Sequence, residues 1–130
     1  IRSDAMLFVW GNNNQGQIGD SSTINKSSPV MIGRSSFIQI GIGVSNFVAL
    51  RDNYTVWTWG VNSSGQLGLG DTLNRSSPTQ LGSAPSGATN SYTFVTAGSS
   101  TLAAISTTYQ LYTWGAGHFG KIGNGSIWQD

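Results

Sequence analysis

Residues 7–19 read LFVWGNNNQGQIG, and the pattern returns as VWTWGVNSSGQLG at residues 56–68 and as LYTWGAGHFGKIG at residues 111–123. In each copy Gly stands one, six and nine residues after the Trp, and an aliphatic residue stands eight after it. The Trp residues are 49 and then 55 positions apart, a spacing typical of repeat architectures. The repeated positions are Trp10, Gly11, Gly16, Gly19, Trp59, Gly60, Gly65, Gly68, Trp114, Gly115, Gly120 and Gly123.

Each copy predicts a short buried strand followed by a tight loop. Apolar, β-branched and aromatic residues precede each Trp, which favours a strand. The three glycines suit positive φ or a close backbone approach, and the Asn and Ser between them cap turns with their own side chains. The aliphatic residue can then fold back under the loop onto the Trp. The repeat is therefore predicted to be a structural module.

The three repeated Trp residues are predicted to be core or inter-sheet packing rather than stacking platforms for bases or sugars. Their strand positions lie between apolar neighbours. Trp57 stands two residues before Trp59 and so shares its sheet face, and we expect it to be packed as well. Trp128 is the best candidate for an exposed aromatic residue.

The composition narrows the class of protein. The chain has 130 residues, 38% of them hydrophobic, which is enough for the core of one small domain. Only 8% are charged, against roughly 25% in ordinary globular proteins, the net charge is +1 and there is no Glu. This uncharged polar composition favours a virion-associated or other extracellular protein over a cytosolic enzyme. The cations are scattered, which argues against nucleic-acid binding, and neither a membrane span nor a cysteine site is predicted.

The repeats divide a single domain, residues 1–130, into units. The first unit covers about 7–55, the second about 56–110 and a partial third 111–130. After the Trp strand of the first unit, Asp20–Pro29 is interpreted as a polar connection. Short strands are then expected at Val30–Gly33, Phe37–Ile42 and Phe47–Leu50. With Gly, Pro and Asn turns between them, the four strands of a unit are predicted to form one antiparallel sheet, and the chain is predicted to be all-β.

The second unit carries six extra residues before its third strand. Insertions in a repeat map to surface loops, often on the binding face, so this loop is a candidate contact for a partner. A tolerated linker is the alternative. The loop consists of Ser83, Ala84, Pro85, Ser86, Gly87, Ala88, Thr89, Asn90 and Ser91.

The combined pattern of Trp-Gly, Asn, Gly-Gln-(Ile/Leu)-Gly and Ser-Ser-Pro, at about 50 residues, resembles the regulator of chromosome condensation repeat over nearly the whole chain. That family builds β-propellers, usually of seven four-stranded blades, and the resemblance implies one blade per repeat. Two departures stand out. Ser45-Asn46 and Ser99-Ser100 occupy a place where the family often has His, and Lys121 replaces the Gln of the other copies.

About two and a third units cannot close a ring, and an open pair of blades leaves sheet faces and edges exposed. We therefore expect further blades. They would come from the same polypeptide, which is the preferred alternative, or from neighbouring chains.

No catalytic, cofactor-binding or metal-binding residue is predicted. Gly115–Gly120 matches Gly-x-Gly-x-x-Gly after a strand, but no helix follows and no acidic residue stands about 20 positions on. His118 is the sole His, so it is expected to be an exposed turn residue rather than part of a metal cluster or triad. Asp20 and Asp71 take similar places in successive units and are expected to be turn residues. A repeated Ca²⁺ site would have too little charge.

The sequence leads to three hypotheses of function, each from a different class. The preferred one is a non-enzymatic interaction or structural module that presents surface loops, similar to virion-associated propellers of the family, as a capsid decoration or tail component. Its partners would be capsid, tail or receptor proteins. The resemblance also implies two alternatives, a guanine-nucleotide exchange factor for a small GTPase and a secreted enzyme inhibitor. Finding the protein in purified particles would favour the first function, nucleotide release from a GTPase the second, and tight inhibition of an enzyme the third.

Overall fold

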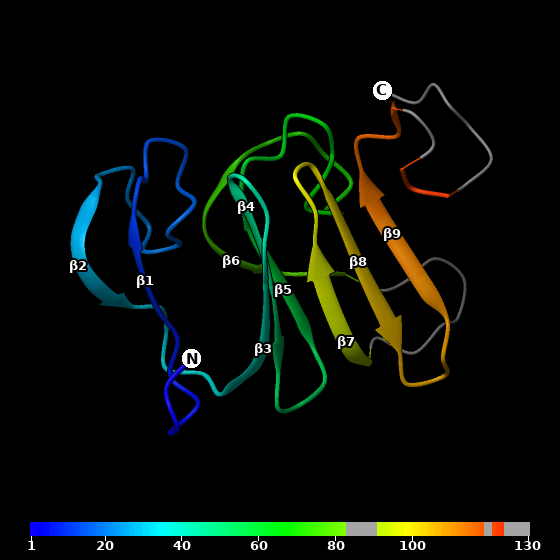
Figure 1. The fold of residues 1–130 in the computed structure, drawn as a ribbon, viewed down its shortest axis with the longest axis horizontal. Helices are drawn as coiled ribbons and strands as arrows, with labels where there is room; N and C mark the ends of the chain where they lie inside the picture. Colours follow the sequence, from blue (N-terminus) through cyan, green and yellow to red (C-terminus); the bar gives the residue numbers. More distant parts are fainter. Residues whose placement is uncertain (83–90, 119–120, 124–130) are drawn as a thin grey trace.

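The chain folds into nine β-strands in a computed structural model that describes residues 1–82, 91–118 and 121–123, and this described part contains no α-helix. The strands are β1 (Phe8–Gly11), β2 (Lys26–Met31), β3 (Phe37–Ile42), β4 (Asn46–Arg51), β5 (Val56–Gly60), β6 (Arg75–Gln80), β7 (Tyr92–Ala97), β8 (Thr101–Ser106) and β9 (Leu111–Gly115). They pair antiparallel in three sheets, ordered β1-β2, β3-β4-β5-β6 and β7-β8-β9. Figure 1 shows these sheets side by side in chain order. The predicted all-β fold of antiparallel, blade-like sheets is confirmed.

The four-stranded sheet combines strands from two sequence units, which corrects the prediction that each unit forms one sheet. β3 and β4 belong to the first unit, whereas β5 and β6 belong to the second. The cause is the tight turn Arg51–Thr55, in which the Arg51 N–H donates to the Thr55 carbonyl and the Tyr54 N–H to the Arg51 carbonyl. This turn pairs β4 with β5 across the unit boundary. A short loop costs little closure entropy, so the hairpin decides which strands share a sheet.

The outer strands begin earlier than predicted. β2 and β6 start at Lys26 and Arg75, inside the segments interpreted as polar connections, and each includes the Ser-Ser-Pro sequence. Both strands lie at a sheet edge, where a proline leaves no ladder hydrogen bond unmade. Pro29 and Pro78 therefore sit within strands without disrupting them.

Two apolar clusters pack between the sheets. The first joins β1 to the four-stranded sheet and consists of Leu7, Val9, Ile18, Ile32, Phe37, Phe47, Ala49 and Trp59. The second joins the four-stranded sheet to β7, β8 and β9 and consists of Val48, Leu50, Val56, Leu81, Tyr92, Val95, Leu102 and Ala104. The second pair of sheets meets closely at β3 and β7, where a Cβ on Gly41 would lie 2.8 Å from the Ala97 backbone nitrogen.

The first two repeated turns each pack on the Trp of the following unit, not on their own. A Cβ on Gly19 would lie 2.7 Å from Nε1 of Trp59, and a Cβ on Gly68 would lie 2.8 Å from Cδ1 of Trp114. The Trp59 N–H donates to the Gln17 carbonyl at 3.0 Å. The turn thus locks one sheet to the next, which corrects the expectation of packing within a unit.

The three repeated Trp residues differ in burial. Trp59 is fully buried and Trp114 is half-buried, as inter-sheet packing predicts. Trp57 is also half-buried and packs against the first cluster. The prediction is wrong for Trp10, which is 60% exposed, because none of the described glycine turns packs on it as Gly19 packs on Trp59. Trp128 lies outside the described residues.

Gly65→Val is expected to destabilise the fold by about 1–3 kcal/mol through backbone strain alone. Gly65 has a φ of 67°, and a Cβ there would meet nothing within 4 Å, so space is not the obstacle. A β-branched side chain strongly resists this left-handed conformation. Thermal unfolding followed by circular dichroism measures the loss, with Ser64→Val as the control at the exposed neighbouring position. Equal melting temperatures for the two variants would contradict the strain argument.

Candidate interaction surface

A buried Asn closes the long turn of the first unit. Asn13 is 0% exposed, and its amide nitrogen donates to the carbonyls of Ser22 and Ile24 at 3.0 and 3.1 Å and to the Asp20 carboxylate at 3.1 Å. Its amide oxygen accepts the N–H of Ile18 at 2.9 Å. One side chain therefore ties together both halves of the loop between β1 and β2. We call this arrangement the Asn clamp.

The second unit repeats the clamp with Asn62, which is also 0% exposed. Its amide nitrogen donates to the Asp71 carbonyl at 2.9 Å, and its oxygen accepts the Leu67 N–H at 2.9 Å. The third copy has Gly117 at this place, so the clamp is missing there. Each clamped loop also carries an ion pair, between Asp20 and Lys26 at 3.0 Å and between Asp71 and Arg75 at 2.6 Å.

These contacts place Asp20 and Asp71 in turn structures, as predicted from their positions. Burial raises the pKa of Asp20, but hydrogen bonds from Ser22, Lys26 and Asn13 outweigh it and lower the pKa to about 2. The hydrogen bond from Arg75 lowers the pKa of Asp71 as well. Both carboxylates stay ionised at neutral pH and serve the loop rather than acid–base chemistry.

Asp20 is expected to make the fold sensitive to acid. Its folded-state pKa lies below the unfolded value of about 3.9, so its stabilising contribution is present above pH 4 and is lost as the pH falls toward 2. Asp20→Asn should lower the melting temperature at pH 7 and flatten its decline between pH 4 and pH 2. Melting curves of both proteins across this range test the point. Parallel declines would show that another group governs the acid response.

The clamped loops form one face of the molecule, at the top of Figure 1. They are linked to each other, because the Asn74 side chain donates to the Gln15 side chain at 2.9 Å and the Ser21 N–H donates to the Ser76 carbonyl at 2.7 Å. Ile24 and Leu73 stand at equivalent tips and are 68% and 65% exposed. We call this the loop face.

The opposite face carries the tips of two equivalent hairpins, β4–β5 and β8–β9, at the bottom of Figure 1. Tyr54 and Tyr109 occupy these tips with φ of 65° and 63°, and they are 51% and 91% exposed. A non-glycine residue in this conformation is uncommon, and its persistence often accompanies function. We call this the hairpin face.

The described end of the predicted partner loop lies against both hairpins. The Ser91 carbonyl accepts the Thr107 N–H at 2.9 Å, and the Tyr92 N–H donates to the Tyr54 carbonyl at 2.8 Å. Residues 83–90 of that loop lie outside the described part of the chain. The hairpin face therefore brings together two exposed tyrosines and the base of the loop that the sequence singled out.

The remaining predicted positions show no constellation for chemistry. Within residues 1–82, 91–118 and 121–123, no group of three His, Cys, Asp or Glu side chains could hold a metal ion. His118 is exposed, as predicted for a turn residue, while Gly120 lies outside the described residues. The described part also contains no helix long and apolar enough to cross a membrane.

The family model of the regulator of chromosome condensation (RCC1) repeat matches residues 4–50 and 55–105. The chain belongs to the RCC1 repeat family. These two matches confirm the resemblance that the Trp-Gly and Gly-Gln-(Ile/Leu)-Gly pattern indicated. No curated protein sequence gives a significant match to the chain.

Solved RCC1 propellers share the fold. Yeast Prp20p, from a study of its binding to Gsp1p and histones, aligns with a TM-score of 0.83 and 21% identity over 97% of this chain and 32% of its own. Yeast RCC1 (Prp20) bound to Kap60 gives 0.80 and 21% over 95% and 31%. Human WBSCR16 gives 0.77 and 25% over 92% and 31%. The chain thus spans about a third of the length of these proteins.

Two features of these faces were missed by sequence reasoning. The buried Asn stood among several Asn and Ser residues interpreted together as turn caps, although Asn13 and Asn62 alone recur three places after the Trp in the first two units. The equivalence of Tyr54 and Tyr109, five residues before Trp59 and Trp114, was also visible in the repeat. Their exposure was not, because aromatic residues beside apolar strands usually pack.

Proposed function

We propose that the chain is part of a non-enzymatic, protein-binding propeller whose hairpin face contacts the partner. The observation that carries the proposal is the pair of exposed tyrosines held at equivalent hairpin tips, Tyr54 and Tyr109. Tyrosine supplies a large contact area at low conformational-entropy cost and is enriched at protein interfaces. Each tyrosine stands at the tip of a paired hairpin, β4–β5 or β8–β9, so the backbone that carries it is already ordered before binding.

A pair of double variants tests this proposal. Tyr54→Asn/Tyr109→Asn removes both rings, and Asn tolerates the left-handed backbone, so the fold should be kept. Ile24→Asn/Leu73→Asn is the matched control on the loop face. After chemical crosslinking in the native source, mass spectrometry should show the partner with the wild type and the control but not with the tyrosine variant. Retention of the same partner by the tyrosine variant would exclude the hairpin face.

Further blades are also part of the proposal, from the same polypeptide or from neighbouring chains. Two observations support it. β1 pairs on one side only, whereas the equivalent β5 pairs on both, and the exposed Trp10 occupies the place that a preceding turn covers at Trp59. Light scattering on the protein purified from its source, compared with the mass of one polypeptide, separates the two sources of blades. A native species of one 13.7 kDa chain would contradict both.

The low charge of 8% supports an extracellular or virion-associated location, with capsid, tail or receptor proteins as partners. Copurification with particles would support this assignment, and its absence from particles would count against it. Exchange-factor activity is the second candidate, because Prp20p, studied for its binding to Gsp1p, has the same fold. Accelerated nucleotide release from a small GTPase would favour it. Tight inhibition of a secreted enzyme would instead favour the inhibitor alternative.

A further inference from the structure

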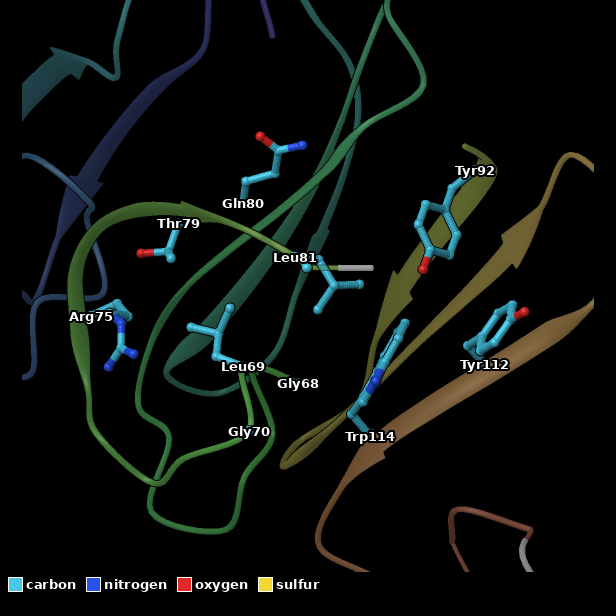
Figure 2. Close-up of a pocket in the computed structure, with 11 residues that line it drawn as sticks. Gly68, Leu69, Gly70, Arg75, Thr79, Gln80, Leu81, Tyr92, Tyr112 and Trp114 are labelled. Atoms are coloured by element: carbon cyan, nitrogen blue, oxygen red, sulfur yellow. The ribbon is translucent and has the colours of Figure 1, made fainter. Parts of the chain in front are cut away.

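A cavity of about 500 Å³ lies between the four-stranded sheet and the third sheet. Its walls are largely apolar and aromatic, from Leu69, Leu81, Tyr92, Tyr112 and Trp114, and the exposed Gln80 lies at its mouth. Figure 2 shows the three aromatic rings on one side and the loop leading to β6 on the other. The volume falls within the range of small-molecule sites.

The equivalent space between the first two sheets is occupied by side chains. There Phe47 stacks on the buried Trp59 with ring centroids 5.4 Å apart, and Val30 packs against the same cluster. The second interface has Leu102 in place of Phe47 and Thr79 in place of Val30. Thr79 and the half-buried Trp114 line the cavity, whereas the equivalent Val30 and Trp59 pack in the first apolar cluster. The residues at the cavity therefore differ from those at the equivalent positions of the first interface.

Two hydrogen-bond donors at the cavity have no partner among the described residues. The Tyr92 hydroxyl is buried and unpaired, although a buried hydroxyl normally finds an acceptor. In Figure 2 it points toward the space between Leu81 and Trp114. The Trp114 N–H, unlike that of Trp59, donates to no described acceptor. Burial and the nearby Tyr112 raise the pKa of Tyr92, so its hydroxyl keeps its proton at neutral pH.

The positive charge at the cavity is already neutralised by an ion pair. Arg75, the one charged residue among the described residues of the lining, pairs with Asp71 at 2.6 Å and also donates to the Leu73 carbonyl. A charged ligand would therefore gain little from it. We propose that this cavity binds a neutral, planar aromatic or heteroaromatic molecule whose carbonyl or ring acceptor receives hydrogen bonds from Tyr92 and Trp114.

Coumarin is a suitable probe because it is flat, neutral and bicyclic with a carbonyl acceptor, and naphthalene is its matched control without the acceptor. In the wild type, coumarin should shift the indole N–H resonance of Trp114 but not that of Trp59. Naphthalene should bind about 25-fold more weakly, the equivalent of losing two neutral hydrogen bonds of about 5-fold each. Equal affinities for the two probes, or no binding of coumarin, would overturn the proposal.

Two variants locate the interaction. Tyr92→Phe should weaken coumarin binding about 5-fold and leave naphthalene binding unchanged. Its fold should persist, because Phe37 occupies the equivalent place in the first interface. Tyr109→Phe should bind both probes as the wild type does, since Tyr109 is 91% exposed at a hairpin tip and does not line the cavity. If Tyr92→Phe bound coumarin with the affinity of the wild type, the role of the Tyr92 hydroxyl would be refuted. The comparison of the two probes on the wild-type protein tests the proposal even if a variant fails to fold.

Discussion

Trp59→Ala is expected to lower the free energy of unfolding by about 3–5 kcal/mol, the usual range for removing a large buried aromatic side chain. The Trp59 ring is fully buried in the first apolar cluster and stacks on Phe47 at 5.4 Å. The substitution also removes the donor to the Gln17 carbonyl and the ring against which Gly19 packs. It therefore loosens both the core and the lock between two sheets.

The same chain provides the control for this experiment. Trp10 occupies the equivalent strand position but is 60% exposed in the single chain, so Trp10→Ala should cost less than about 1 kcal/mol when this chain is measured as a monomer without further blades. Urea unfolding followed by circular dichroism gives both values. Similar losses for the two variants would mean that something covers Trp10 in solution, and little loss in either would contradict the locking role of the Trp.

The repeat period predicted the strands well because their residues face the same local demands in each unit. Phe37–Ile42 was expected as a strand and was found within the same bounds, and the strand expected before Trp59 was found as Val56–Gly60. The glycines after each Trp required positive φ, as Gly16 and Gly65 show with φ of 76° and 67°. These properties depend on the residues themselves and on their immediate neighbours, which a sequence displays directly.

Which strands share a sheet could not be predicted from the repeat in the same way. A repeat has no natural start, so the sequence does not say whether Phe47–Leu50 shares a sheet with the Trp strand before it or the one after it. The short turn at Arg51–Thr55 decides for the latter. The exposure of Trp10 has the same origin, since its burial would require a neighbour that local sequence does not specify.

The face that we propose for binding was predicted only in part. The contact of the inserted loop with a partner stays a prediction, and its described end at Ser91 lies on the hairpin face, where it pairs with Thr107 beside one tyrosine hairpin. The cavity could not be foreseen. Its lining has Thr79 where the first interface has Val30 and Tyr112 where it has Trp57, and that comparison has meaning only once the two interfaces are known to be equivalent.

Asn13→Ala is expected to cost about 2–4 kcal/mol, because it leaves several buried groups without partners, each worth roughly 1–3 kcal/mol. The N–H of Ile18 and the carbonyls of Ser22 and Ile24 all bond the Asn13 side chain. Asn14→Ala, at the exposed neighbour, should change stability by less than about 0.5 kcal/mol. Urea unfolding measures both.

Asn13→Asp tests the role of the donor separately. The variant keeps the acceptor for the Ile18 N–H. It replaces the amide nitrogen that lies 3.1 Å from the Asp20 carboxylate with a second carboxylate oxygen. Like charges at this distance repel, so the variant should be at least as unstable as Asn13→Ala at pH 7. If both substitutions were tolerated, the loop would be held by its glycines and its ion pair, and the Asn clamp would not be what fixes the loop face. The replacement of this Asn by Gly117 in the third copy would then have no bearing on how a loop of the repeat is held.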